Sequence, residues 1–257
     1  MKRIHLFEWE DLQWFPKSLR NYGTDFLQFL SNKTSLYKPV VPLLAKAMKG
    51  MNQNQILDLA SGGGGGWQSL SQELQTEISD LKITLTDYFP NLPAFKRTAG
   101  GISCVEYSTE RVDARDVPKD LKGFRTQFLS FHHFRPTDAL AILQNAVDSK
   151  SGLAIVEAQE RSLPSILAMV FSPITLLLTT PFIRPFSLGR ILFTYLIPIM
   201  PLMVLWDGVV SCFRTYSVSE MEALVWQLQN AENTDFNIGK LKSGPGVVLY
   251  LIAVPKG

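Results

Sequence analysis

Short apolar runs alternate with longer polar stretches through the middle of the chain. The clearest runs are ILDLA (56–60), KITLT (82–86), QFLSF (127–131) and LAIVEA (153–158). Apolar runs of this length, separated by helical stretches, are typical of buried parallel strands covered by helices. The pattern therefore predicts an α/β fold.

The two ends of the chain show different patterns. Near the start, aromatic and acidic residues precede an amphipathic, helical stretch from Leu19 to Leu30. Near the end, a predicted helix around 219–229 precedes the strand-like run VVLYLIAV (247–254), which resembles half of a closing hairpin. We expect a single domain with an N-terminal helical lid (1–50), a cofactor-binding core (51–160), an apolar insertion or substrate cap (161–216) and closing elements (217–257).

The stretch from Leu163 to Trp206 is extremely apolar. Its segments 163–183 and 191–206 carry no charge, and Arg184 and Arg190 lie between them. The first segment reaches the ~20 residues that a membrane-spanning helix needs. A hairpin that leaves and rejoins one sheet would place both arginines on the far side, against the positive-inside tendency. We therefore predict a re-entrant or surface-lying pair of short helices, with a soluble cap or a homodimer contact as the alternative.

Composition narrows the class of protein. The 257 residues are 46% hydrophobic, and 25 Lys+Arg nearly balance 23 Asp+Glu, so a nucleic-acid partner is not expected. Two cysteines, Cys104 and Cys212, are too few for a disulfide framework or a cysteine-based metal site. The start has acidic residues where an export signal needs an apolar run. We predict a location in the cytoplasm or on the cytoplasmic face of the membrane, and no metal site.

A run of five glycines follows the first apolar strand. Ser61 precedes Gly62 to Gly66, and residues 68–78 are expected to form a helix. Glycines let a ligand approach the backbone closely, and the start of a helix offers unpaired N–H groups. The order of strand, glycine turn and helix favours a nucleotide-binding corner over a merely flexible loop.

Three carboxylates accompany this corner. Asp87 follows the next strand, 25 residues beyond Gly62, where a carboxylate can bind both hydroxyls of a ribose. That spacing also fits NAD. Asp58 precedes the glycines, where it would attract the cationic end of a ligand, and Asp113 is placed to accept a hydrogen bond from an adenine amino group.

In these motifs the chain resembles the class I S-adenosylmethionine (SAM)-dependent methyltransferases. ILDLASGGG (56–64) is similar to the family's first motif, with Ala60 where glycine is usual, and LTDYFPN (85–91) to its ribose-binding motif. VDARDVP (112–118) resembles the adenine-binding motif, and FHHF (131–134) the segment after the fourth strand. The match covers roughly residues 55–160 and the terminal strands.

The resemblance implies a Rossmann-like seven-stranded sheet with helices on both faces, and SAM as the cosubstrate. It implies Asp87 at the ribose, Asp113 near the adenine, and the Ser61 to Gly64 backbone beside the methionine moiety. The full set of predicted cofactor-binding residues is Asp58, Ala60, Ser61, Gly62, Gly63, Gly64, Asp87, Tyr88, Asp113 and Ala114.

Methyl transfer from a sulfonium mainly requires alignment of donor and acceptor and exclusion of water. His132 and His133 follow a predicted strand, and one of them is the candidate to position or deprotonate the acceptor. Alternatively, one caps the next turn and the other packs beside Phe134. Glu157 and Asp207 are further candidate bases.

A structural pair between Asp207 and Arg214 is a slightly favoured alternative to a catalytic role for Asp207, because buried polar groups in that run need partners.

We expect methyl transfer to a hydrophobic small molecule or lipid, because the insertion follows the fifth strand, next to the acceptor side of a methyltransferase pocket. A homo-oligomer and peripheral membrane contact are both compatible with the sequence. One alternative is a non-catalytic module that keeps the fold and binds a lipid or partner. Another is a nicotinamide-dependent oxidoreductase, which would leave Asp58 and Asp113 without a role.

Overall fold

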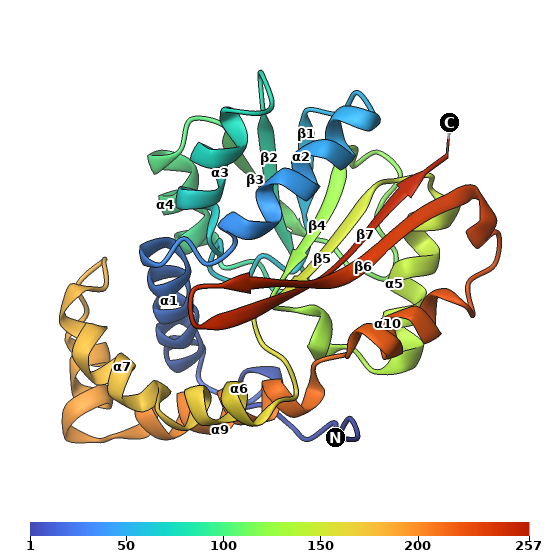
Figure 1. The fold of residues 1–257 in the computed structure, drawn as a ribbon. Helices are drawn as coiled ribbons and strands as arrows, with labels where there is room; N and C mark the ends of the chain where they lie inside the picture. The colour runs from blue at the N-terminus through green and yellow to red at the C-terminus, as the bar shows by residue number, and fades with distance from the viewer. Residues whose placement is uncertain (257) are drawn as a thin grey trace.

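Seven strands form one mixed sheet in the order β3-β2-β1-β4-β5-β7-β6 (Figure 1). The structure, a computed structural model, describes residues 1–256. The first five strands are parallel, and β7 is antiparallel to both β5 and β6. The strands are β1 (Gln55–Asp58), β2 (Lys82–Asp87), β3 (Val105–Arg111), β4 (Phe124–Phe128), β5 (Leu153–Glu157), β6 (Thr234–Ser243) and β7 (Gly246–Pro255). The Rossmann-like seven-stranded sheet and its closing hairpin are confirmed.

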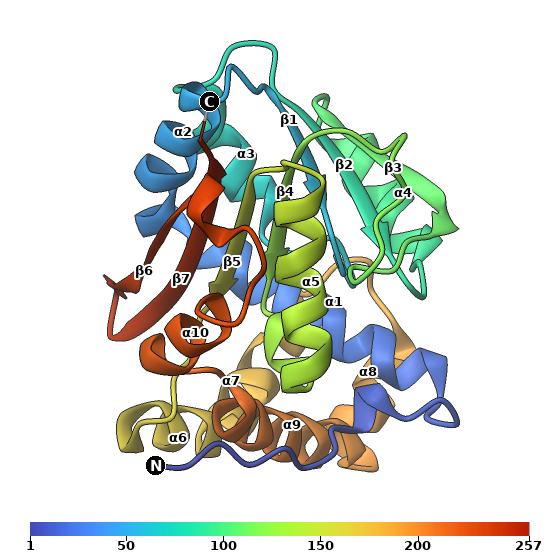
Figure 2. The same ribbon diagram turned by 90° about the vertical axis from the view of Figure 1, so that its right-hand side faces the viewer.

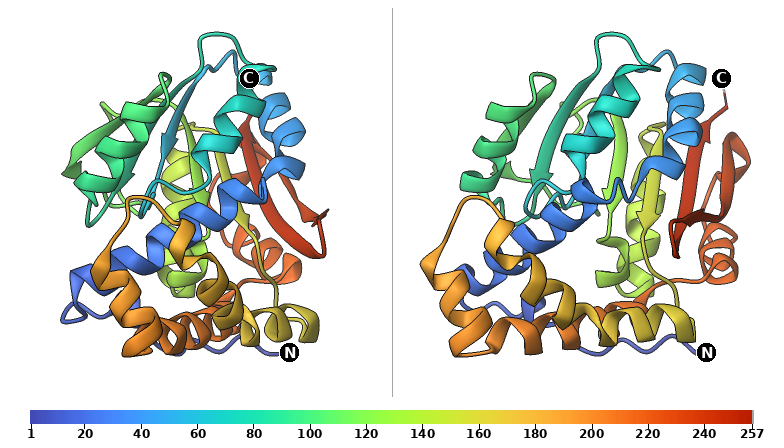
Figure 3. Two further views of the ribbon diagram at one scale, coloured as in Figure 1. Left: turned by 90° about the vertical axis from the view of Figure 1, so that its left-hand side faces the viewer. Right: turned by 60° about the vertical axis from the view of Figure 1, so that its left-hand side comes forward.

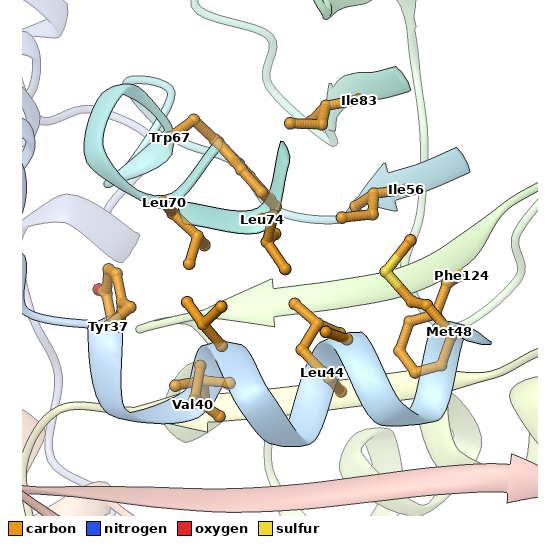
Figure 4. Packing of buried hydrophobic residues seen from close by; sticks show 14 of the residues in the cluster. Tyr37, Val40, Leu44, Met48, Ile56, Trp67, Leu70, Leu74, Ile83 and Phe124 are labelled. Atoms are coloured by element: carbon orange, nitrogen blue, oxygen red, sulfur yellow. The ribbon is translucent and has the colours of Figure 1, made fainter. Parts of the chain in front are cut away.

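Helices cover both faces of this sheet, as Figure 2 shows. One face carries α2 (Val41–Gly50), α3 (Trp67–Gln75) and α4 (Leu92–Gly101), and the other carries α5 (Pro136–Asp148) and α10 (Val218–Val225). Between α2, α3 and the strands, a close-packed core is formed by Leu44, Met48, Leu74, Ile56 and Ile83, each at most 1% exposed (Figure 4). This core packs α2 and α3 against β1 and β2, the strands whose carboxyl ends carry the predicted site.

The insertion forms a helical layer beyond those carboxyl ends (Figure 3). It follows β5 and contains α6 (Leu163–Val170), α7 (Ser172–Thr179), α8 (Leu188–Ile191), a π-helical turn (Leu192–Leu196) and α9 (Ile199–Arg214). α6 and α7 lie side by side with α9. The segment Leu163–Phe182 is long and apolar enough to cross a membrane. Only 11% of the 18-residue apolar stretch within it is buried inside the protein. The layer therefore presents much of its apolar surface outward.

The N-terminal region links this layer to the sheet. A strap of residues 3–11 ends in a short turn (Trp9–Asp11) and runs along α9 (Figure 2), and α1 (Lys17–Lys33) follows it. Phe15, Leu19 and Phe26 pack with Leu176 and Met203 of the insertion in a separate apolar cluster. The N-terminal region and the insertion thus form one unit, although about 130 residues separate the end of α1 from the start of α6 in the chain.

Two strand predictions need correction. The fourth strand is β4 (Phe124–Phe128) rather than residues 127–131, because the apolar run continues past the strand into the short helical turn Phe131–His133. β3 (Val105–Arg111) was not among the clearest runs, since it is an edge strand whose side chains after Val105 are half-buried or exposed.

Candidate active site

The glycine corner joins the carboxyl ends of β1 and β2. The Ser61 amide donates to the carbonyl of Thr86 at 2.9 Å, and the Gly62 amide donates to Asp87 Oδ2 at 2.9 Å. The other oxygen of Asp87 accepts a 2.7 Å hydrogen bond from the Phe89 amide. Burial raises the pKa of Asp87, and these two amides act in the opposite direction. The structure therefore brings the glycine loop and the predicted ribose carboxylate into direct contact.

The loop backbone needs residues that tolerate left-handed conformations. Gly62 has φ 56° and Gly64 has φ 92°, and a Cβ on Gly64 would lie 2.7 Å from Thr98 Oγ1. Ala60 has φ 52°, a region that glycine adopts without cost. Ala60 stands where the resembled methyltransferase motif usually has glycine, so the backbone of Ala60 is locally strained.

Asp58 lies beneath the loop and is only 2% exposed. Its carboxylate accepts hydrogen bonds from Trp67 Nε1 at 2.8 Å and from Thr126 Oγ1 at 2.7 Å. Burial raises its pKa to about 6, partly offset by those two donors. Since each carboxylate oxygen can accept two hydrogen bonds, one further donor per oxygen can be bound. A direct role toward the cationic end of a ligand stays a prediction.

Asp113 lies at the same edge, because the neighbouring Val112 amide donates to the carbonyl of Asp87 at 3.0 Å. Its carboxylate binds Arg115 through Nε at 3.0 Å and Nη2 at 2.7 Å, and these bonds lower the pKa of Asp113. An adenine amino group would share this carboxylate with Arg115. Of the remaining predicted residues, Tyr88 is 45% exposed at the rim and Ala114 is buried.

The histidine pair lies in the turn that follows β4, next to β1 in the sheet. The His132 amide donates to Glu157 Oε1 at 3.0 Å, and its Nδ1 lies 2.8 Å from Glu157 Oε2. A carboxylate only accepts, so Nδ1 carries the proton and Nε2 points away from Glu157. His132 is therefore held by the end of β5 rather than capping the next turn, so the capping alternative is wrong for His132. A role for either histidine toward the acceptor stays a prediction.

His133 is held by the N-terminal strap. Its Nδ1 lies 2.8 Å from Asp11 Oδ1, and the two imidazole rings are 4.3 Å apart. Burial alone would lower the pKa of His133, but the carboxylates of Glu8 and Asp11 raise it to about 10. For Asp11, the hydrogen bond and charge of His133, together with Arg214, outweigh burial and lower the pKa.

Comparisons with known proteins identify the fold. No family model matches the sequence, and no curated protein matches it. Among solved structures, a complex of the plantazolicin methyltransferase BpumL with a monoazolic desmethylPZN analog and SAH is 9% identical, with a TM-score of 0.56 over 93% of this chain and 91% of that chain. Human N-acetylserotonin methyltransferase in complex with SAM is 13% identical, with a TM-score of 0.50 over 91% of this chain.

The chain has the class I methyltransferase fold. Its sheet order, with β7 antiparallel between β5 and β6, differs from the 3-2-1-4-5-6 order of dinucleotide-binding folds. The chain spans 57% of the human enzyme's length and 55% of the mitomycin 7-O-methyltransferase MmcR, to which it is 15% identical with a TM-score of 0.47. These identities show the fold alone.

Within this methyltransferase fold, the expected pair between Asp207 and Arg214 is wrong. Asp207 Oδ1 accepts a 2.8 Å hydrogen bond from the Trp9 amide, and burial raises the pKa of Asp207 to about 8. Arg214 instead binds Asp11 and lies 3.0 Å from Glu8 Oε1, and it donates to the carbonyls of His132 and His133. The strap, which lies along α9, therefore pairs with both residues. Its Trp9 amide binds Asp207, and its Glu8 and Asp11 pair with Arg214.

Sequence reasoning missed Glu8 and Asp11 as parts of this site. Both lie in FEWED (7–11), where the acidic residues served only as evidence against an export signal. One usable signal was present: a carboxylate between large aromatic residues, in a segment expected to pack, needs a buried partner. The identity of that partner could not be read from the sequence, because His132 and Arg214 lie more than 120 residues away.

Proposed function

We propose that the chain is a methyltransferase that moves the methyl group of SAM to a hydrophobic small molecule. The observation that carries the proposal is the convergence of the glycine loop, Asp87 and Asp113 at one edge of a class I methyltransferase sheet. Two structural neighbours, which are methyltransferases solved in complex with SAH or SAM, support the same reaction.

The chain's own residues would bind and align the reactants. Asp87 would accept hydrogen bonds from the ribose hydroxyls, and Asp113 from the adenine amino group. Gly62 and its neighbours would let the methionine part of SAM lie against the backbone. The transferred methyl passes in line from sulfur to the acceptor, so no covalent enzyme intermediate is required.

The accepting atom would lie beside the histidine pair. His132 is fixed through both its amide and its Nδ1 by Glu157, which orients Nε2 for a polar acceptor group. His132 is 3% exposed and Glu8 of the strap covers it. An acceptor that contacts Nε2 must therefore displace part of the strap, which makes the N-terminal region the lid of the acceptor site.

The insertion supports an apolar acceptor. Large hydrophobic side chains are exposed on the outer surface of α6, α7, the π-helical turn and α9 and at the junction of α6 and α7, among them Leu167, Phe171, Ile174, Leu178, Leu196 and Leu202. An apolar surface of this kind beside an acceptor site suits a lipophilic molecule, delivered from solution or from the cytoplasmic face of a membrane.

Flotation with phosphatidylcholine–phosphatidylglycerol vesicles tests the membrane source. A Phe171→Glu, Leu178→Glu double variant should float less than the unchanged protein, and equal flotation removes membrane contact from the proposal.

Calorimetric titration with SAM tests the donor site. Asp87→Asn should weaken binding about 10-fold to 100-fold, because hydrogen bonds to a charged acceptor are lost. Asp120→Asn, which changes an exposed carboxylate away from the corner, should bind SAM as the unchanged protein does. If folded protein does not bind SAM, the proposal fails.

A second measurement separates the enzyme from a non-catalytic module with the same fold. The protein is incubated with methyl-labelled SAM and a lipid extract, and label is sought in the apolar fraction. Incorporation that requires the protein supports the enzyme. SAM binding without transfer to any fraction of a cell extract favours the module.

A further inference from the structure

Glu8 is an unexplained buried charge. Its side chain is fully buried, and neither carboxylate oxygen accepts a hydrogen bond from residues 1–256. The Arg214 guanidinium lies 3.0 Å from Oε1 as an ion pair without hydrogen-bond geometry, and no cation of the described residues lies that close to Oε2. Burying a carboxylate in this way is costly unless another group completes its environment.

The groups that face Glu8 are two imidazole nitrogens. His132 Nε2 lies 3.8 Å from Glu8 Oε1, and His133 Nε2 lies 3.8 Å from Glu8 Oε2. Glu10 Oε1 lies 3.5 Å from the same His133 nitrogen. These separations are too long for hydrogen bonds. They are close to the ~3.4 Å that separates neighbouring ligand atoms around a tetrahedral metal with bonds of about 2.1 Å.

The orientation of both histidines fits the same chemistry. His132 Nδ1 is bound to Glu157 and His133 Nδ1 to Asp11, each at 2.8 Å. Metal-binding histidines almost always donate their second ring N–H to a carboxylate or carbonyl, which fixes the ring and leaves the other nitrogen for the metal. Here both Nε2 atoms are directed at one buried carboxylate, and the candidate ligand atoms of Glu8, His132 and His133 lie within 4.8 Å of one another.

The local charge also favours a cation. Four carboxylates, those of Glu8, Glu10, Asp11 and Glu157, surround the two imidazoles, and Arg214 is the cation that contacts them. A histidine that binds a metal through Nε2 has given up the proton on that nitrogen. With both imidazoles neutral the group is strongly negative, and a divalent ion offsets most of that excess. Imidazole and carboxylate ligands together suit zinc and its first-row neighbours rather than magnesium or calcium.

We propose that Glu8, His132 and His133 form a three-residue binding site for a divalent transition-metal ion such as Zn²⁺, with a fourth position open to water. The ion joins the N-terminal strap to the turn after β4, and so holds the lid closed over the end of the sheet. The site stands on the geometry of these side chains and does not depend on the proposed methyl transfer.

Cobalt substitution tests this site directly. Protein stripped of metal with a chelator is titrated with Co²⁺, and the visible absorption of the bound ion is recorded. We expect a saturable band from one tetrahedral Co²⁺ per chain, its displacement by Zn²⁺, and a Zn²⁺-dependent rise in Tm. A folded, stripped protein that gives neither a Co²⁺ band nor heat with Zn²⁺ would falsify the site, and the cluster would then be neutralised by a proton on the imidazoles.

Matched variants assign the ligands. Glu8→Gln should weaken Co²⁺ binding at least about tenfold, an effect that loss of even an outer partner can produce. His5→Gln removes the chain's remaining histidine, which lies outside the cluster, and should bind Co²⁺ unchanged. If Glu8→Gln does not fold, His133→Gln replaces it. The assignment is overturned if His5→Gln weakens Co²⁺ binding as much as the ligand variant does. It is also overturned if a folded ligand variant binds Co²⁺ as tightly as the unchanged protein.

Discussion

The cofactor corner and the histidine end of this fold hold their carboxylates in different ways. At the corner, Asp87 accepts hydrogen bonds from two main-chain amides, that of Gly62, 25 positions before it, and that of Phe89, two positions after it. Asp113 binds Arg115, two residues away. At the histidine end, Arg214 reaches Asp11 across 203 positions and His133 reaches it across 122. The corner is therefore assembled by the sheet itself, whereas the histidine end is assembled only when the strap docks.

This difference predicts unequal costs for removing an arginine from each region. Arg214 is 1% exposed and lies against the fully buried Glu8 and the partly exposed Asp11, so Arg214→Ala leaves the buried Glu8 carboxylate without its cation. We expect a loss of about 3–5 kcal/mol in the free energy of unfolding, measured with urea. Arg115→Ala removes a half-exposed partner of Asp113 and should cost about 1 kcal/mol or less. Equal losses would remove the distinction between the two regions.

The corner could be predicted from the sequence because its determinants are local. A buried strand, glycines with left-handed φ angles and a carboxylate at the next strand's end each follow from short segments, and the sheet brings these ends together. The histidine end could not be predicted in the same way. His132 and His133 were identified as candidates, but the partners Glu8 and Asp11 are set by the docking of the strap on α9, a tertiary contact without a local pattern.

The sheet prediction succeeded and failed for the same kind of reason. β1, β2, β5 and β7 are apolar because at least one face of each is buried, and their positions were predicted within two residues. The boundary of β4 was shifted because Phe131 stays buried after the strand has ended. Burial persists through that turn, so hydrophobicity alone cannot locate the strand end.

Acid titration offers a second test of the corner. The pKa of Asp58 is raised from 3.8 to about 6 in the folded protein, so the folded state keeps this proton to higher pH than the unfolded chain does. The contribution of Asp58 to stability is therefore fully present below pH 3.8 and is lost as pH rises through about 6. Two pKa units correspond to about 3 kcal/mol.

The free energy of unfolding should be compared between the unchanged protein and Asp58→Asn from pH 4 to pH 7. We expect the difference between them to fall by about 2 kcal/mol across that range, because part of the change lies below pH 4. Asp113→Asn is the control, because Arg115 lowers the pKa of Asp113 below 3.8 and this carboxylate stays mostly ionised in both the folded and the unfolded state from pH 4 to pH 7. The difference for Asp113→Asn should therefore stay nearly constant across that range. A flat difference for Asp58→Asn would show that its carboxylate is not desolvated.

Glycine replacements test how closely the corner is packed. Gly64→Ala adds a Cβ at φ 92° and 2.7 Å from Thr98 Oγ1, and should lower the free energy of unfolding by about 2 kcal/mol. Gly65→Ala also has a positive φ, but its Cβ meets no atom within 4 Å, so only about 1 kcal/mol should be lost. Chemical unfolding measures both variants. Indistinguishable losses would mean that Thr98 moves aside and that the loop is looser than its contacts indicate.

The smallest expected effect has the opposite sign. Ala60 adopts φ 52°, so Ala60→Gly should relieve left-handed strain of about 1–2 kcal/mol. Glycine also gains freedom in the unfolded chain, which offsets up to about 1 kcal/mol. We expect a net gain of about 0.5–1 kcal/mol in the free energy of unfolding, with SAM affinity retained. Ala141→Gly, in the middle of α5, should instead lose about 1 kcal/mol. If both variants lose stability alike, the backbone of Ala60 is not strained. The residues packed around Ala60 would then accommodate its side chain without a cost to the backbone.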